Sequence, residues 1–255
     1  MTEGPLLPQL SPAWAFHLAT SNPPWAYPPQ ASAAGSGDVV ELPEPQPLHA
    51  SLDEALAGRA SCRRFSPSAL SGAELSAVLR AGYGVTGHAS VEGFEFDTRP
   101  VPSAGAKYPL EVCLLALNVD GVEPAAYAYL PARHGLRRTS PAVPATDIVE
   151  LFLGQPYLAG AGAVLVLAGA PSRTMARYGD RGYRYVLFEA GHVAQNLILA
   201  ARAVGLGSLN LGGFYDQALA ELLGLQGTDQ VPLYGLAVGR PLAGDPRDPV
   251  VPSTS

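Results

Sequence analysis

The chain has 255 residues, a formal net charge of −6 and a hydrophobic share of 47%. This composition excludes a disordered chain, and the length suffices for a sizeable core in one large domain or two small ones. The acidic balance argues against nucleic acid or an anionic membrane as the main partner. No run reaches the roughly 18 apolar residues of a membrane span. Since no secretory signal is recognisable either, we expect a cytoplasmic location.

Residues 1–50 are rich in proline, which removes amide donors and fixes φ. We therefore expect an extended N-terminal segment without helix, followed by one folded domain over residues 51–255. Four aromatic residues, Trp14, Phe16, Trp25 and Tyr27, favour packing of this segment on its own or a partner subunit. A disordered leader is the alternative.

Two capping boxes, Ser51 with Glu54 and Ser71 with Glu74, predict helices over residues 51–58 and 71–82. Residues 85–108 are interpreted as a loop. Apolar runs predict buried strands at 110–118, 161–170 and 231–239, and a hairpin is predicted over 125–140. Short helices are predicted at 146–154 and 216–223. Because these elements do not alternate strictly as βαβ units, the pattern favours a single α+β domain.

The longest helical pattern runs through residues 177–207 and is apolar at three- and four-residue steps. Its other face carries Tyr185, Phe188 and Leu199, which are too large and apolar for a solvent-facing side. We expect a central helix that is covered on both sides and ends at Gly205 with a left-handed cap.

The loop that follows the first predicted helix offers guanidinium and hydroxyl donors that suit a phosphate. These donors belong to Arg59, Ser61, Arg63 and Arg64. A solvated basic loop is the alternative. The small-residue turn of Pro102, Ser103, Ala104 and Gly105 allows a ligand to approach the backbone, or simply feeds the next strand. Gly212 and Gly213 could likewise free backbone amides for a ligand or mark a bulge.

Other motifs are weak. Glu189 and His192 have the spacing of a carboxylate–histidine metal pair, but no second pair accompanies them, so His192 is interpreted as a hydrogen-bonded core histidine and no metal is expected. The sequence GYGVTG at 82–87 follows a helix rather than a strand and is rejected as a dinucleotide fingerprint. Ser103 lacks the context of a hydrolase nucleophile elbow. Cys62 and Cys113 are too few for a disulfide framework.

Four segments, taken in order, resemble the nitroreductase-like flavoproteins and, within them, the SagB-type dehydrogenases. They are RASCRRFSPSALSGAELSAVLRAGYGVTG, RPVPSAGAKYPLEV, RYGDRGYRYVLFEAGHVAQNLILAARAVGLGS, and LGGF with LAVGRP. The resemblance covers roughly residues 51–242. It implies a mixed sheet flanked by helices, an intertwined homodimer and FMN at the subunit interface.

By this resemblance, Arg59, Ser61 and Arg63 would hold the FMN phosphate and ribityl chain. Arg64 could replace a second basic residue that the family often has at the position of Ala60. Pro102 to Gly105 would line the flavin ring from the partner subunit, and Gly212 and Gly213 would present amides near flavin N5. Arg240 or Arg247 could add a further phosphate cation.

SagB-type enzymes are associated with oxidising azolines to azoles in ribosomally made peptides, and azoline-oxidising members carry a Lys-Tyr pair thought to move the proton. Here the pair is Arg177-Tyr178. Arginine keeps its proton in proteins, so Arg177 would orient or stabilise an anion and Tyr178 is the better acid/base candidate. A structural pair at the start of the helix is the alternative.

The leading hypothesis is an FMN-dependent dehydrogenase that oxidises a peptide-like or heterocyclic natural-product intermediate, with O₂ reoxidising the flavin and biosynthetic enzymes as possible partners. An NAD(P)H-dependent nitro- or quinone reductase is the alternative enzyme. A non-catalytic flavin-binding scaffold subunit is the alternative of another class, because the proline-rich leader suits docking.

Overall fold

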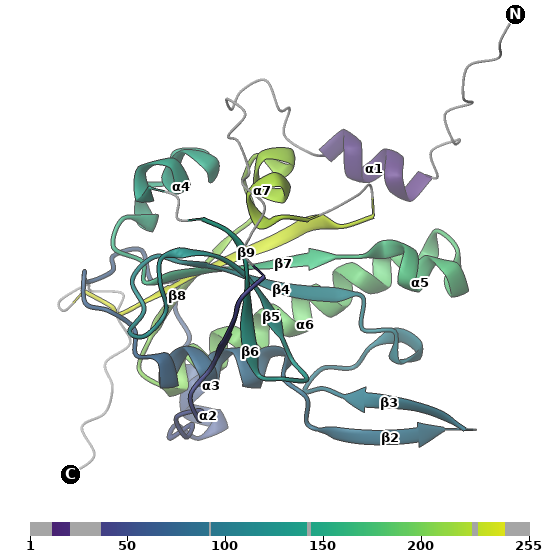
Figure 1. The fold of residues 1–255 in the computed structure, drawn as a ribbon, viewed down its shortest axis with the longest axis horizontal. Helices are drawn as coiled ribbons and strands as arrows, with labels where there is room; N and C mark the ends of the chain where they lie inside the picture. The colour runs from purple at the N-terminus through teal and green to yellow at the C-terminus, as the bar shows by residue number, and fades with distance from the viewer. Residues whose placement is uncertain (1–11, 21–36, 92, 142–143, 226–228, 243–255) are drawn as a thin grey trace, which may run out of the picture.

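The computed structural model describes residues 12–20, 37–91, 93–141, 144–225 and 229–242. In them, helices flank a seven-stranded sheet, which confirms the expected α+β class (Figure 1). Across the sheet the order is β1 (Val39–Glu41), β6 (Gly135–Ser140), β5 (Ala125–Leu130), β4 (Leu110–Ala116), β7 (Ala163–Gly169), β9 (Val231–Gly239) and β8 (Gly207–Leu211).

Every ladder between these seven strands is antiparallel. A mixed sheet also contains parallel pairs of strands. Within the described residues, parallel pairing occurs at two isolated bridges, Ser61–Ser208 and Leu70–Val119. The central strand β7 is buried along its whole length, because its successive side chains enter two different cores. Leu165 belongs to one apolar cluster and Val166 to the other.

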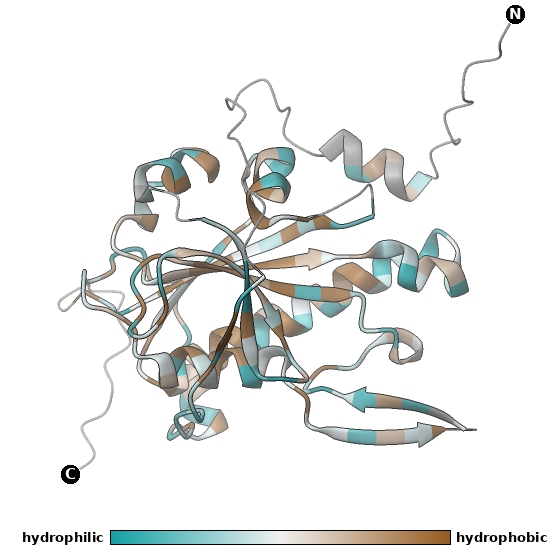
Figure 2. Ribbon diagram, in the orientation of Figure 1, coloured by the Kyte–Doolittle hydropathy of each residue, from teal (hydrophilic) through white to brown (hydrophobic). Residues whose placement is uncertain are grey.

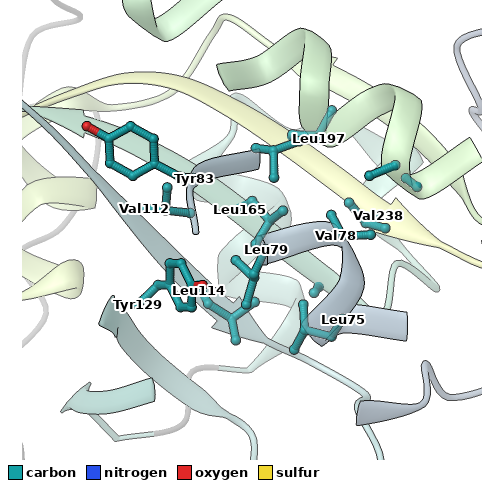
Figure 3. Close-up of a cluster of buried hydrophobic side chains, with 14 of the residues drawn as sticks. Leu75, Val78, Leu79, Tyr83, Val112, Leu114, Tyr129, Leu165, Leu197 and Val238 are labelled. Atoms are coloured by element: carbon teal, nitrogen blue, oxygen red, sulfur yellow. The ribbon is translucent and has the colours of Figure 1, made fainter. Parts of the chain in front are cut away.

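One cluster lies under α3 (Gly72–Tyr83) and α6 (Arg181–Ala203), and the other under α4 (Ala145–Leu151) and α7 (Asp216–Leu223), so helices cover both faces of the sheet. Figure 3 shows Leu79 and Leu197 from the first helix pair converging on Leu165. Both predicted capping boxes are present, at α3 and at α2 (Leu52–Ala57).

The predicted long helix is two helices. α5 (Pro171–Tyr178) ends at Gly179, whose φ of +55° breaks the helix before α6 begins. At the other end, Gly205 has a φ of +79° and Leu206 N donates to Ala201 O at 2.8 Å, which confirms the left-handed cap.

One face of α6 is buried, whereas the described residues leave much of the other face exposed. Val186, Val193 and Leu197 are fully buried, whereas Leu187 is 38% and Phe188 56% exposed. His192 is also exposed, so the expectation of a core histidine is wrong: it lies on the outward side of α6.

The N-terminal segment contains α1 (Pro12–Thr20), which corrects the expectation that residues 1–50 form no helix. His17 Nδ1 lies 2.8 Å from Tyr183 Oη, so α1 packs on α6 of its own chain. Trp25 and Tyr27 lie outside the described residues, as does the side chain of Trp14.

Residues 85–108 are not a plain loop, because β2 (Gly87–Val91) and β3 (Phe94–Thr98) form an antiparallel hairpin that projects from the body (Figure 1). A short 3₁₀ turn, η2 (Ala104–Ala106), follows, and a second one, η3 (Pro156–Leu158), lies after α4. Figure 2 shows hydrophobic and hydrophilic residues mixed along the hairpin, in contrast to the hydrophobic stretches of β4 and β7. In the part of the chain that the structure describes, no helix is long and apolar enough to cross a membrane.

Candidate functional site

The cationic segment, residues 59–64, is fixed by backbone hydrogen bonds to two strands. Cys62 N donates to Ser208 O of β8 at 2.8 Å, and Leu242 N, just after β9, donates to Arg64 O at 2.9 Å. Cys62 is buried, whereas its neighbours Ser61 and Arg63 are half-buried. An extended chain alternates sides, so Ser61 and Arg63 share the side opposite Cys62. This arrangement fits the predicted use of their hydroxyl and guanidinium as donors to one anion.

Two glycines allow this segment to lie so close to the fold. A Cβ on Gly207 would be 2.7 Å from Cys62 Sγ, and one on Gly58 would be 2.6 Å from Arg202 Nε. Real Cβ atoms essentially never approach so closely, so both positions require glycine unless neighbours move. Arg202 of α6 therefore adds a guanidinium beside the start of the cationic segment, a residue that the sequence reasoning missed.

Arg240 lies at the same end of the sheet but is engaged by the protein itself. Its Nε donates to Ala69 O at 3.1 Å, and one Nη donates to Glu74 Oε2 at 2.9 Å. Since Glu74 is buried, its carboxylate neutralises part of this charge. The structure thus gives Arg240 a structural role, and its use as a phosphate cation stays a prediction. Arg247 lies outside the described residues.

The small-residue turn that begins at Pro102 lies directly before β4. The Ser103 hydroxyl accepts a hydrogen bond from Tyr108 N at 2.8 Å and thereby closes the turn. The backbone inside it is unusual, since φ is +61° at Gly105, +51° at Ala106 and +42° at Tyr108. The left-handed region costs a residue with a Cβ about 1–2 kcal/mol, so the alanine and the tyrosine are strained.

Gly105 brings this turn against the Arg177-Tyr178 pair. A Cβ on Gly105 would lie 2.8 Å from Tyr178 Oη and 3.7 Å from Arg177 Cδ. Two motifs that are far apart in sequence therefore meet in one place within a single chain. The tyrosine ring is held from the other side by an edge contact with Tyr185, with ring centroids 5.2 Å apart.

A hollow of about 480 Å³ opens beside this contact. It is lined by Val91 and Phe96 of the hairpin, by Ser103, Gly105, Ala106 and Lys107 of the turn, and by Arg177 of α5. The hairpin, which the sequence did not predict, thus supplies an apolar wall to a hollow whose other walls are cationic or small. Such a shape suits a small or extended ligand with an anionic or polar group.

A buried carboxylate of α6 holds the Pro102–Gly105 turn in place. Glu189 of α6 is 2% exposed, accepts a hydrogen bond from Tyr83 Oη at 2.9 Å and hydrogen-bonds to the Ser103 hydroxyl. Burial raises the pKa of Glu189, and the two hydroxyl donors oppose that rise. Burial likewise raises the pKa of Tyr83, with the Glu189 charge adding to it. The pattern Glu-x-x-His indicated the glutamate, but its partners could not be read from the sequence.

The guanidinium of Arg99 lies over the rings of Tyr83 and Tyr108, 4.1 and 5.0 Å from their centroids. It donates to Tyr83 O at 3.4 Å, while no described residue accepts from its buried Nε. This cation stacks on both aromatic residues and so links Glu189's partner Tyr83 to the strained turn.

Gly212 and Gly213 follow β8 at its end opposite Ser61. The Cβ direction at Gly212 is open, with no described atom within 4 Å, whereas a Cβ on Gly213 would meet Leu153 at 2.8 Å. Phe214 is buried and packs edge-on against Phe152. The backbone at Gly212 is therefore open on one side, and the buried Phe214 holds the chain just after it; a role of these glycines in ligand binding stays a prediction.

The candidate residues divide between the two ends of the sheet. The cationic segment lies where β7 begins and β9 ends, whereas Gly105 and Arg177 lie where β7 ends and β4 begins. The seven residues of β7 separate these ends, which corresponds to about 20 Å of extended chain. One chain therefore does not bring its cationic segment and its Pro102–Gly105 turn to the same ligand group.

Comparisons with known proteins agree with this architecture. The model of the nitroreductase family matches residues 56–240. A protein of Methanocaldococcus jannaschii named as a nitroreductase is 40% identical over 204 residues, which cover 80% of this chain and 98% of that protein. The microcin B17-processing protein McbC of Escherichia coli is 31% identical over 145 residues, covering 53% of this chain and 52% of McbC.

Among solved structures, the E. coli microcin synthetase McbBCD complex with truncated pro-MccB17 bound holds a similar chain. The TM-score is 0.61 at 26% identity, and the match covers 71% of this chain and 68% of that one.

Proposed function

Since the chain belongs to the nitroreductase family, we propose that this oxidoreductase is an FMN-dependent dehydrogenase acting on a peptide-like or heterocyclic substrate. The observation that carries the proposal is the contact of the Pro102–Gly105 turn with Tyr178. It supports the proposal because the Tyr178 hydroxyl, the proposed acid/base group, lies beside the turn that is proposed to line the flavin.

The described residues fit FMN. The cationic segment supplies Arg59, Ser61 and Arg63 as donors for a phosphate dianion, with Arg64 exposed beside them. The open backbone at Gly212 gives a flat ring room to approach, and its amide and that of Gly213 are the proposed donors near N5. When bound, FMN would supply the hydride-accepting chemistry, and the protein would bind and orient the substrate.

The proposed site needs two copies of the chain, because the cationic segment and the turn lie at opposite ends of β7. In a homodimer, the turn of one protomer would face the cationic segment of its partner. The uncovered face of α6, with Leu187 and Phe188 exposed, offers an apolar surface for this association. A two-sided apolar pattern on α6 is then explained by burial against the second copy.

Arg177 and Tyr178 would divide the catalytic work. Arg177 is exposed and lines the hollow, so its permanent charge suits the binding of an anionic or carbonyl group of the substrate. The Tyr178 hydroxyl lies next to Gly105 and can accept or donate a proton to a substrate held there.

The likeness to McbC supports a peptide-like substrate and biosynthetic partner enzymes, because McbC is a microcin B17-processing protein and the similar solved chain belongs to a complex with truncated pro-MccB17 bound. A thiazoline-containing peptide is therefore the first substrate to test. In this proposal O₂ reoxidises the flavin.

The purified protein tests the proposal in three measurements. A flavin absorption spectrum shows whether FMN binds, mass spectrometry follows the loss of two hydrogens from a thiazoline peptide, and light scattering gives the oligomeric state. Phe188→Asp should yield monomers that lose FMN, whereas Leu48→Asp, at an exposed apolar residue outside α6, should not. A colourless protein that FMN does not reconstitute supports the scaffold alternative.

An NAD(P)H-dependent nitro- or quinone reductase is the second candidate, favoured by the name of the M. jannaschii relative at 40% identity. Anaerobic mixing with NAD(P)H separates the two functions. Rapid bleaching of the flavin together with an intact thiazoline peptide supports the reductase and contradicts the dehydrogenase.

A further inference from the structure

The hollow beside Gly105 contains a side chain to which neither the motifs nor the proposed function gives a role. Lys107 lines this hollow together with Arg177, Ser103 and Phe96. It is half-buried and follows η2 directly, two residues after Gly105, whose neighbour is the Tyr178 hydroxyl.

Lys107 is the single lysine of the chain. The other fifteen of its sixteen lysine and arginine residues are arginine. Arginine thus serves wherever this protein needs a surface cation, an ion pair or a phosphate donor. The one amine lies in the hollow that adjoins the proposed catalytic tyrosine, which is the place where the chemistry of an amine differs most from that of a guanidinium.

The backbone at Lys107 is also held in an unusual shape. Lys107 itself has a φ of −80°, but the residues on either side, Ala106 and Tyr108, have φ values of +51° and +42°. Strained non-glycine residues persist where the surroundings fix them, and they concentrate at functional sites. Here the Ser103 hydroxyl and the stacked Arg99 fix Tyr108, so the direction of the chain at Lys107 is set from both sides.

We propose that Lys107 is a catalytic residue that exchanges a proton with the substrate in this hollow; the inference rests on the proposed dehydrogenase function. A dehydrogenation removes one hydrogen as hydride and a second as a proton. Arg177 does not take up that proton, because a guanidinium stays charged in proteins. The neutral Tyr178 hydroxyl is a much weaker base than a neutral amine and would instead donate or relay a proton, whereas a neutral lysine amine accepts it; Lys107 carries the only lysine amine of the chain.

The hydride leaves one substrate atom with both electrons of its bond and goes to the oxidised flavin of the proposed function. The hydrogen on the adjacent substrate atom leaves as a proton to Lys107 Nζ, and the electron pair of that bond forms the new double bond. The ammonium of Lys107 would then return its proton to solvent, and O₂ would take the two electrons and the transferred hydrogen from the flavin, gain one proton from solvent and leave as H₂O₂.

The charged and titratable groups near Lys107 come from three elements. From α5, Arg177 lines the hollow and Tyr178 reaches Gly105. On β3, Glu95 and Asp97 are the sequence neighbours of Phe96 and lie on the opposite side of that strand. On the hairpin, Asp97 is paired with His88 at 2.7 Å. From α6, Glu189 reaches the turn through Ser103.

A single lysine makes the first test independent of turnover. An acetylating reagent modifies Lys107 and the α-amino group, and peptide mass spectrometry quantifies each. Loading the protein with FMN and a thiazoline peptide should slow acetylation of Lys107 and leave the α-amino group unchanged. Equal acetylation of Lys107 with and without these ligands overturns the inference.

The second test is catalytic. Lys107→Arg keeps the charge and removes the base, so kcat for the thiazoline peptide should fall about 10²–10⁴-fold with unchanged FMN content. The rise of kcat with pH that a neutral amine requires should disappear. Lys107→Arg combined with Arg177→Lys returns an amine to the same hollow and should recover part of the rate and of the pH dependence.

The catalytic role of Lys107 and the proposed dehydrogenase function fail in different ways. A Lys107→Arg holoenzyme with the wild-type rate and pH profile overturns the role of Lys107 and leaves the proposed function standing. A wild-type holoenzyme that binds FMN but leaves the thiazoline peptide unoxidised overturns the proposed function, and the inference falls with it.

Discussion

The contact between Gly105 and Tyr178 gives the sharpest prediction for a single substitution. Gly105→Ala adds a Cβ at a φ of +61° and 2.8 Å from Tyr178 Oη. The left-handed backbone costs about 1–2 kcal/mol, and moving the tyrosine ring away from Tyr185 costs a further ~1 kcal/mol. For a chain of this size, each kcal/mol lowers Tm by about 2–4 °C, so Tm should fall by about 4–12 °C.

Gly121→Ala is the matched control, because Gly121 also has a positive φ, of +77°, but no described atom lies within 4 Å of its Cβ position. It should show only the backbone cost, about 1–2 kcal/mol. Both proteins gain the same entropic benefit from losing a glycine in the unfolded state, so the difference between them reports the steric contact. Differential scanning calorimetry measures both. Equal shifts in Tm, together with unchanged turnover by the Gly105→Ala protein, would refute the argued contact with Tyr178.

Three further predictions concern other parts of the fold. Gly207→Ala places a Cβ 2.7 Å from Cys62 Sγ and should therefore displace the cationic segment. Equilibrium dialysis should then show FMN binding weakened roughly tenfold or more, which corresponds to about 1.4 kcal/mol. The control variant Gly93→Ala, in the hairpin, should bind FMN normally. Burial raises the pKa of Glu189 above 4.5, so its contribution to stability is complete below that value and is lost as the pH rises through the raised pKa. Urea unfolding of wild type and Glu189→Gln should therefore show a stability difference that changes with pH over this range, and a constant difference contradicts the assignment. Burial lowers the pKa of His17 below 6.5, so docking of α1 should weaken as the pH falls below that value. Limited proteolysis at α1 should increase there in wild type, and His17→Phe should remove this pH dependence.

Local signals in the sequence predicted much of the fold. Ser71 and Glu74 carry the information for a helix start within four residues, and the structure has that capping box. The hairpin β2–β3 was not predicted because its strands are only five residues long and β2, GHASV, has no clear hydrophobic alternation, although β3, FEFDT, does alternate. The break between α5 and α6 at Gly179 was not predicted, because the apolar period continues from one helix into the other.

The candidate site was predicted as separate pieces. Tyr178 and the Pro102–Gly105 turn could each be named from a motif, but their contact depends on the packing of α5 against the start of β4. The same holds for Glu189, whose partners Tyr83 and Ser103 come from two other segments. One signal behind the proposed role of Lys107 is a residue count, which requires no structure.

The hydrogen bond from Cys62 to Ser208 has a consequence for solubility. β8 is an outermost strand, and open strand edges pair readily with other chains. The segment of residues 59–64 lies against this edge, where Cys62 N occupies Ser208 O, and it carries three arginines. The other outermost strand, β1, is only three residues long. The proposed phosphate-binding segment therefore also protects the sheet from edge-to-edge aggregation, so selection on either property constrains the same residues.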